Sequence, residues 1–161
     1  MVYNGSADNE YISDDLLYAI QNGATLKDLN GISDDTMQDI HLMAYECYQR
    51  KRFNDALVLF HFLLVYDFYN PEYAMGLGAI YQTQKKYSKA IDFYALAYTL
   101  SNNDYRPMFY TGECNLMLGK SVQATTCFEI VAENSKDSAL IEKSKIYLIH
   151  LKDRRDGNAS N

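Results

Sequence analysis

The sequence contains no tryptophan, two prolines and eight glycines among its 161 residues. So few prolines and glycines exclude a collagen-like chain and a chain made mainly of linkers. Basic residues are also scarce: 15 lysines and arginines stand against 21 aspartates and glutamates, a formal net charge of −6. Because nucleic acids and anionic membrane surfaces both attract clustered basic residues, we expect neither as a partner.

Long apolar runs and paired cysteines are missing as well. The longest apolar run, residues 57–65, is interrupted by His61 and is too short to cross a bilayer. The first eleven residues carry neither a basic residue nor an apolar core, so they do not resemble a signal peptide. Three cysteines without CxxC spacing are typical of reduced thiols. We therefore expect a soluble, cytoplasmic, single-domain protein.

Aromatic residues, in contrast, are abundant. The chain has 15 tyrosines and seven phenylalanines, more rings than a core of this size usually needs. Some of these rings are therefore expected to line a contact surface.

A period of 34 residues organises the middle of the chain. A small residue, then an alanine, then an aromatic ring recur at this offset in three copies: Ala44, Gly78 and Gly112; Ala56, Ala90 and Ala124; Phe60, Tyr94 and Phe128. Small residues let two helices approach closely, and a ring one turn later fills the space beside them. The pattern resembles the tetratricopeptide repeat. It implies an all-α solenoid of three helix-turn-helix units at residues 37–70, 71–104 and 105–138.

Further helices are expected on both sides of the repeats. Residues 1–36 contain a short amphipathic helix that begins after Ser13 and ends at Gly23. Residues 139–152 carry an apolar stripe suited to a capping helix, which a three-unit solenoid needs to cover its open end. Residues 153–161 are charged and polar, and we expect them to be disordered. Ser33 and the pair Asn70-Pro71 are typical of helix starts.

In this repeat family the first helix of each unit lines a concave surface. In the first unit His41, Tyr45 and Tyr48 lie at i, i+4 and i+7 and so share one helix face. Such rings suit an extended apolar or proline-containing segment. The alternative is that they pack on the N-terminal helix. The opposite face carries the residues expected to pack on the neighbouring helix: Ile40, Met43, Ala44 and Cys47.

A second group of surplus rings lies on the second helix of the first unit. Phe62 and Tyr66 stand outside the columns that hold packing residues. Because exposed apolar patches usually mark interfaces, we expect a dimer surface here, shared with Leu16, Leu17 and Ile20. The alternative is that these three N-terminal residues cover Phe62 and Tyr66 within one chain.

Three sequence blocks support a more specific resemblance. They are residues 23–32, residues 66–79 (YDFYNPEYAMGLGA) and residues 103–107 (NDYRP). They resemble the class II chaperones of bacterial type III secretion systems, which hold hydrophobic translocators before export. The resemblance implies a cytoplasmic chaperone, a homodimer formed through the N-terminal helix, and a groove for an extended translocator segment with a Pro-x-Leu-x-x-Pro motif. Some members also assist a transcriptional activator, and for this chain that role stays open.

Carried over by position, the resemblance assigns seven residues to the groove. His41 stands where an aromatic ring is common in the family, so the polarity of the pocket and the choice of partner are expected to differ. The seven residues are His41, Tyr45, Tyr48, Phe53, Met75, Gln82 and Phe109.

The sequence offers little support for an enzyme. His41, His61 and His150 lack the spacing of metal ligands, and Cys127 lies on an apolar helix face. No glycine-rich phosphate loop occurs. We therefore expect no catalytic activity, no metal and no cofactor.

A different class of binding protein is the main alternative. A general tetratricopeptide adaptor for a C-terminal carboxylate needs clustered lysine, arginine and asparagine. Here Arg106 is isolated among Glu72 and Glu113. A scaffold within a larger complex also stays open.

Overall fold

The computed structural model describes residues 18–19 and 21–159, and side chains as far as Arg154. The described residues form helices and no strands. The helices are α2 (Leu26–Leu29), α3 (Asp34–Gln49), α4 (Phe53–Tyr66), α5 (Pro71–Thr83), α6 (Tyr87–Leu100), α7 (Arg106–Met117), α8 (Ser121–Asn134) and α9 (Ser138–Ala159).

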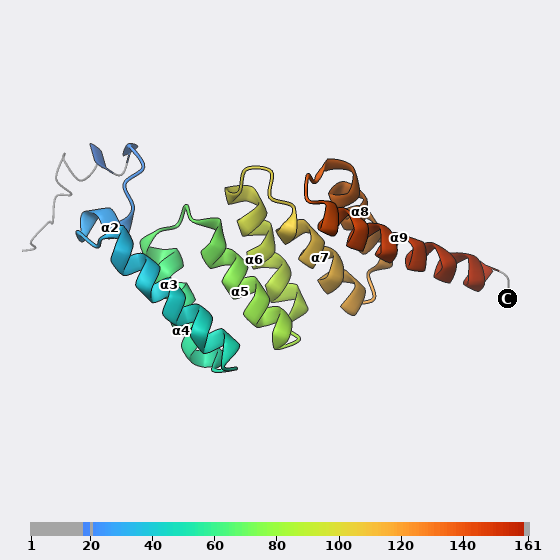
Figure 1. The fold of residues 1–161 in the computed structure, drawn as a ribbon, viewed down its shortest axis with the longest axis horizontal. Coiled ribbons are helices and arrows are strands. Elements are labelled where there is room, and N and C mark those ends of the chain that lie inside the picture. Colours follow the sequence, from blue (N-terminus) through green and yellow to red (C-terminus); the bar gives the residue numbers. More distant parts are fainter. Residues whose placement is uncertain (1–17, 20, 160–161) are drawn as a thin grey trace, which may run out of the picture.

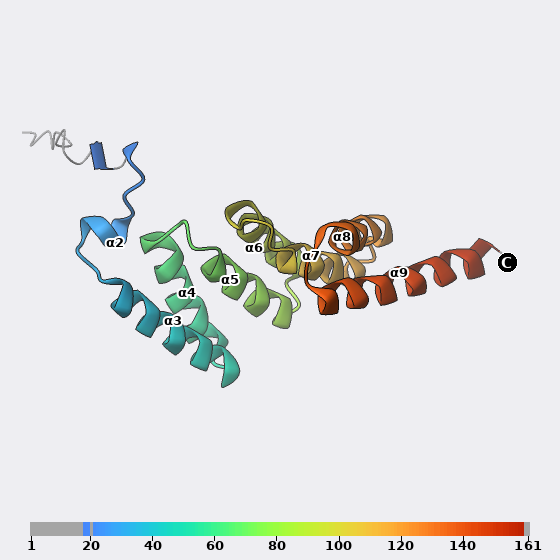
Figure 2. The same cartoon turned by 45° about the horizontal axis from the view of Figure 1, so that its top comes forward.

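Helix pairs follow one another along an elongated molecule. Helices α3 and α4, α5 and α6, and α7 and α8 form the three helix-turn-helix units, and each unit contacts the next. Helix α9 packs on α8, and α2 and α9 lie at opposite ends of the row (Figures 1 and 2). The all-α repeat solenoid predicted from the 34-residue period is thereby confirmed.

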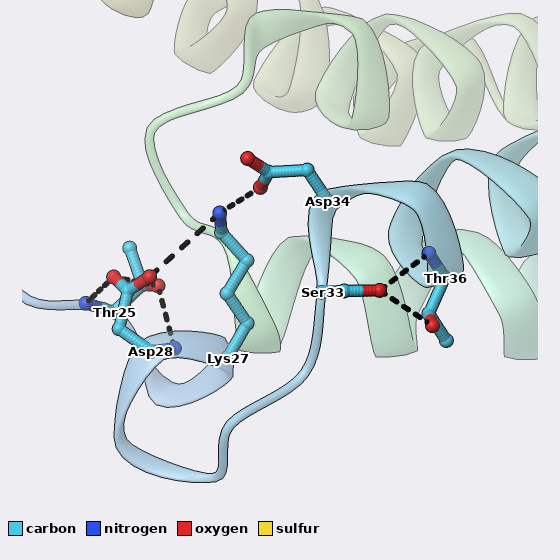
Figure 3. Close-up of polar contacts among 6 residues, drawn as sticks. All are labelled: Thr25, Lys27, Asp28, Ser33, Asp34 and Thr36. Atoms are coloured by element: carbon cyan, nitrogen blue, oxygen red, sulfur yellow. Dashed lines mark hydrogen bonds and ion pairs between the residues drawn. The ribbon is translucent and has the colours of Figure 1, made fainter.

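Polar side chains cap α2 and α3 and link these two helices at the start of the first unit (Figure 3). Thr25 and Asp28 form a reciprocal capping box at the start of α2. The Ser33 hydroxyl accepts a hydrogen bond from the Thr36 amide and so caps α3, as its sequence position predicts. Lys27 of α2 forms an ion pair with Asp34 in the first turn of α3. These contacts hold α2 against the start of the solenoid.

The recurring small residues lie where two helices of a unit meet. A Cβ atom added to Gly78 would lie 2.5 Å from the ring of Tyr94, and one added to Gly112 would lie 2.8 Å from the ring of Phe128. Both rings are fully buried. Glycine is therefore favoured at these two positions, because the aromatic ring of the second helix occupies the space that a side chain of the first helix would take.

One expected packing residue of α3 is exposed instead. Met37, Ala44 and Cys47 are buried, whereas Met43 keeps 55% of its surface exposed. Met37, Ala44 and Cys47 belong to one core cluster with residues of α4 and α5, and Met43 lies outside that cluster.

Helix α9 is longer than the sequence suggested. It continues to Ala159 and so includes most of the segment 153–161 that was expected to be disordered. Lysine and arginine are good helix formers, and they extend a helix whose apolar residues Leu140, Tyr147 and Leu151 already pack on the third unit.

Two findings concern the chain outside the repeats. The helix expected after Ser13, with Leu16, Leu17 and Ile20, lies outside the described residues. Within the described residues, no helix has the length and hydropathy needed to span a membrane.

Candidate binding groove

A cavity of about 400 Å³ lies between the first helices of the units, α3, α5 and α7. Its size is within the range of binding sites for small ligands and short side-chain anchors. We call this cavity the groove. It is lined by His41, Tyr45, Tyr48, Phe60, Glu72, Met75, Gly76, Ala79, Gln82, Thr83, Tyr94 and Tyr110.

Helix α3 supplies one wall of the groove through three of the residues predicted from the sequence. The His41 ring lies edge-on to Phe60 and Tyr73, with ring centroids 5.7 and 5.2 Å apart. Tyr45 keeps 54% of its surface exposed, so within the described residues its ring is available for contact. The Tyr48 hydroxyl lies 3.3 Å from the hydroxyl of Thr83 across the groove.

Burial changes the chemistry of His41. Desolvation lowers the pKa of the imidazole, and the nearby Glu72 carboxylate only partly opposes this. The ring is therefore neutral near pH 7. A neutral imidazole among aromatic rings leaves the wall uncharged, although a polar residue stands where the resemblance implies an aromatic one.

Helix α5 forms the second wall, and here Met75 and Gln82 also lie where predicted. Both side chains line the groove and are half-buried. Gly76, one residue after Met75, has no side chain, and a Cβ atom there would lie 2.3 Å from the ring of Phe60. Phe60 therefore reaches the groove from α4, behind α5.

Two residues assigned to the groove lie elsewhere. Phe53, the first residue of α4, packs beside Tyr48 with ring centroids 6.0 Å apart and does not line the groove. Phe109 is 4% exposed, because Tyr147 of α9 and Phe128 of α8 both pack against its ring. The last helix thus covers, in the third unit, a position that is open in the first two.

Three aromatic residues of the groove were not assigned to it from the sequence. Phe60 and Tyr94 belong to the column interpreted as core packing, and Tyr110 lies beside a groove position of α7. One sequence feature could have predicted the first two: the glycines Gly76 and Gly78 of α5 have no side chains, so the rings of Phe60 and Tyr94 can reach the concave side past them.

Three hydrogen bonds at the base of the groove, which we call its floor, link side chains of α6, α5, α7 and α9. The Tyr94 hydroxyl donates to Gln82 Oε1 at 2.6 Å, and Gln82 Nε2 donates to Glu113 Oε2 at 3.2 Å. The Tyr147 hydroxyl donates to Glu113 Oε1 at 2.9 Å. Burial raises the pKa of Tyr94, and burial together with Glu113 raises the pKa of Tyr147 to about 12. Both phenols therefore remain protonated donors at neutral pH.

Arg106 is already paired at the edge of the groove. Its guanidinium forms ion pairs with Glu72 of α5 and with Asp104, the latter at 2.7 Å. The hydrogen bond to Asp104 is the largest contribution that raises the pKa of Arg106. An arginine held by two carboxylates is poorly suited to clamp a C-terminal carboxylate.

The rings expected at a dimer surface lie together on α4. Phe62 and Tyr66 stack with centroids 4.3 Å apart and are half-buried. Val65 and Tyr69 beside them keep 58% and 59% of their surfaces exposed. The three N-terminal residues expected to share this surface lie outside the described part of the chain.

The thiols lie apart from the groove lining. Cys47, Cys114 and Cys127 are buried, and burial raises the pKa of Cys114 to about 12. A protonated, buried thiol is a poor nucleophile and a poor metal ligand. In the described part of the chain, no three histidine, cysteine or acidic side chains are placed to hold a metal ion.

The helix pairs, their 34-residue spacing and the groove across their first helices define a tetratricopeptide-repeat protein. The family model described as "Tetratricopeptide repeat" matches residues 37–70 and 71–104. Chaperone protein SicA of Salmonella typhimurium is 45% identical over 152 residues, which cover 94% of this chain and 92% of SicA.

Solved structures agree with this similarity. A chain in a type III secretion complex from Aeromonas hydrophila superposes with a TM-score of 0.80 and 28% identity, over 89% of this chain and 99% of that one. The Yersinia enterocolitica type III secretion chaperone SycD, in complex with a peptide of the translocator YopD, superposes with a TM-score of 0.72 and 26% identity, over 77% and 98%. SycD also forms an alternative dimer. The chain therefore belongs to the family of type III secretion chaperones.

Proposed function

We propose that this protein is a cytoplasmic chaperone that holds hydrophobic translocator proteins before their export. The observation that carries the proposal is the uncharged, ring-lined wall formed by His41, Tyr45 and Tyr48, which opens on the groove between repeat units. The similarity to SycD, whose complex contains a translocator peptide, supports this assignment of the partner.

The groove acts by burying apolar side chains of an extended segment. Each square ångström of apolar surface removed from water contributes about 25 cal/mol, and tyrosine rings lose little rotamer entropy on binding. A segment held in this way is kept from associating with other apolar segments. Holding of this kind is stoichiometric and needs no nucleotide and no catalytic step, so we propose no enzyme activity. The net charge of −6 helps to keep the complex soluble.

We also propose that the chaperone forms a homodimer through the α4 patch of Phe62 and Tyr66 together with the N-terminal segment. Val65 and Tyr69, which are close to these rings in the sequence, are exposed. Dimer formation by SycD supports this proposal.

The test of the groove uses the double variant Tyr45→Glu with Tyr48→Glu. Binding of a fluorescein-labelled peptide with a Pro-x-Leu-x-x-Pro motif is followed by fluorescence anisotropy. We expect affinity to fall by at least about 30-fold, because two carboxylates replace two rings at the centre of the contact. Far-UV circular dichroism should be unchanged, since Tyr45 is exposed and Tyr48 is half-buried.

The matched control is Ala95→Glu with Val122→Glu, which adds the same charge on the exposed faces of α6 and α8. This control should bind the peptide as the wild type does. Undiminished binding by the tyrosine double variant would refute the groove assignment. A wild type that binds no such peptide would favour a scaffold role over that of a chaperone.

A further inference from the structure

Glu113 of α7 lies between two hollows on the concave side. On one side it accepts a hydrogen bond from Gln82, which lines the groove. On the other side it accepts one from Tyr147, which lines a second hollow of about 510 Å³ between α7 and α9. This second hollow is formed by Leu116, Tyr147, His150, Leu151, Asp153 and Arg154.

In the part of the chain whose side chains the structure describes, no cation pairs with the Glu113 carboxylate. Each of its oxygens accepts one hydrogen bond from a neutral donor, whereas an ionised carboxylate offers about four lone-pair sites. Among the described residues, no lysine, arginine or histidine nitrogen lies within 4.0 Å of it. Glu72 and Asp104 at the groove edge are different, because each forms an ion pair with Arg106.

The repeat register places Glu113 on the path of a bound segment. Four residues spaced 34 positions apart occupy equivalent positions on successive helices of the concave side: Tyr45, Ala79, Glu113 and Tyr147. The first three lie on the first helices of the three units, and α9 takes the place of the first helix of a fourth unit. Tyr45 and Ala79 line the groove, and Tyr147 lines the second hollow. A chain that passes from one hollow to the other therefore passes Glu113.

We propose that Glu113 is a specificity-determining residue that binds a lysine or arginine of the translocator segment. This inference rests on the proposed function of the groove. A half-buried carboxylate held by Gln82 and Tyr147 is set in place before binding, and an ammonium or guanidinium forms stronger hydrogen bonds to it than a neutral donor does. The groove thus selects segments that place a basic residue beyond their apolar anchors.

The experiment scans one residue through a host peptide with the Pro-x-Leu-x-x-Pro motif. Three residues, lysine, norleucine and glutamate, are placed in turn at each variable position of the motif and at each of the four residues before and after it. Fluorescence anisotropy then gives the affinity of each peptide. At one or two positions we expect wild-type protein to bind the lysine peptide about tenfold more tightly than the norleucine peptide. The glutamate peptide should bind most weakly at those positions.

Glu113→Gln is the diagnostic variant, because it keeps the shape of the side chain and one of its two acceptor oxygens and removes its charge. The lysine preference should vanish in this variant, while the norleucine peptide should still bind. Glu133→Gln, which removes one carboxylate from the exposed face of α8, should retain the preference.

The outcomes separate this inference from the proposed function. Equal lysine preference in wild type and Glu113→Gln at every position would overturn the role of Glu113 and leave the groove intact. If the wild type bound no peptide at all, norleucine peptides included, that result would overturn both the role of Glu113 and the proposed function of the groove.

Discussion

At the scale of single residues, glycines determine how near the aromatic rings of one helix come to the backbone of another. Gly78 of α5 faces the ring of Tyr94, which is 1% exposed and also held by its hydrogen bond to Gln82. The ring therefore has little freedom to move away. The same contact that packs the second unit also shapes the floor of the groove.

Replacement Gly78→Ala tests this constraint. The added methyl group would lie 2.5 Å from the Tyr94 ring, and overpacking of this kind costs about 1–3 kcal/mol. Alanine recovers about 1 kcal/mol through its higher helix propensity, while displacement of Tyr94 from Gln82 costs about 1 kcal/mol. We expect the free energy of unfolding, measured with urea, to fall by about 1–3 kcal/mol.

The control for this substitution is Ser88→Ala on the exposed face of α6. It should change the free energy of unfolding by no more than about 0.5 kcal/mol. A Gly78→Ala variant as stable as the wild type would show that Tyr94 can move aside at little cost.

The groove residues of the first unit could be predicted from the sequence because they share a helix face that the core does not need. His41, Tyr45 and Tyr48 all line the cavity. Phe109 occupies the same register as His41, and its burial depends on the ring of Tyr147, which is 38 residues further along the chain. Repeat spacing places a residue on a face, but it does not tell whether another helix covers that face.

At the scale of elements, α9 is more than a cover for the last unit. The Tyr147 ring stacks on Phe128 with centroids 4.6 Å apart and an interplanar angle of 2°. It also meets Phe109 edge-on at 5.8 Å and donates to Glu113. One side chain of α9 therefore joins the core of the third unit to the polar floor of the concave side.

Replacement Tyr147→Ala should therefore destabilise the protein strongly. Loss of a stacked aromatic ring and of one charge-assisted hydrogen bond is expected to cost about 2–4 kcal/mol in the free energy of unfolding. Ile149→Ala, at a residue of the same helix that is 59% exposed, should cost less than about 1 kcal/mol. Chemical denaturation of both variants checks this, and equal losses would show that α9 contributes little through the tyrosine.

The sequence allowed the six helices of the repeats to be predicted, because small, alanine and aromatic columns recur there with the same offset. The two elements outside the repeats were harder to predict. Helix α2 has four residues, and its signal is the capping box of Thr25 and Asp28 rather than an apolar stripe. The end of α9 has no apolar stripe: residues 152–154 are charged and exposed, and residues 155–159 include no large apolar residue.

At the scale of the whole molecule, the α4 patch leads to a prediction about mass in solution. If the proposed dimer forms through this patch, either Phe62→Glu or Tyr66→Glu should convert it into a monomer, because a carboxylate would replace one of the two stacked rings at the proposed interface. Light scattering measures the mass directly. An unchanged mass for both variants, with circular dichroism like that of the wild type, would place the dimer surface elsewhere.

Two of the polar contacts on the concave side join residues that are 34 positions apart. Arg106 reaches back to Glu72, and Tyr147 reaches back to Glu113, so each contact ties a first helix to the first helix of the neighbouring turn of the solenoid. Both contacts therefore join successive helices of the concave side. A lysine bound at the open lone pairs of Glu113, as we propose, would place a positive charge directly beside one of these two contacts, so the cargo would lie against the joint between the third unit and the last helix.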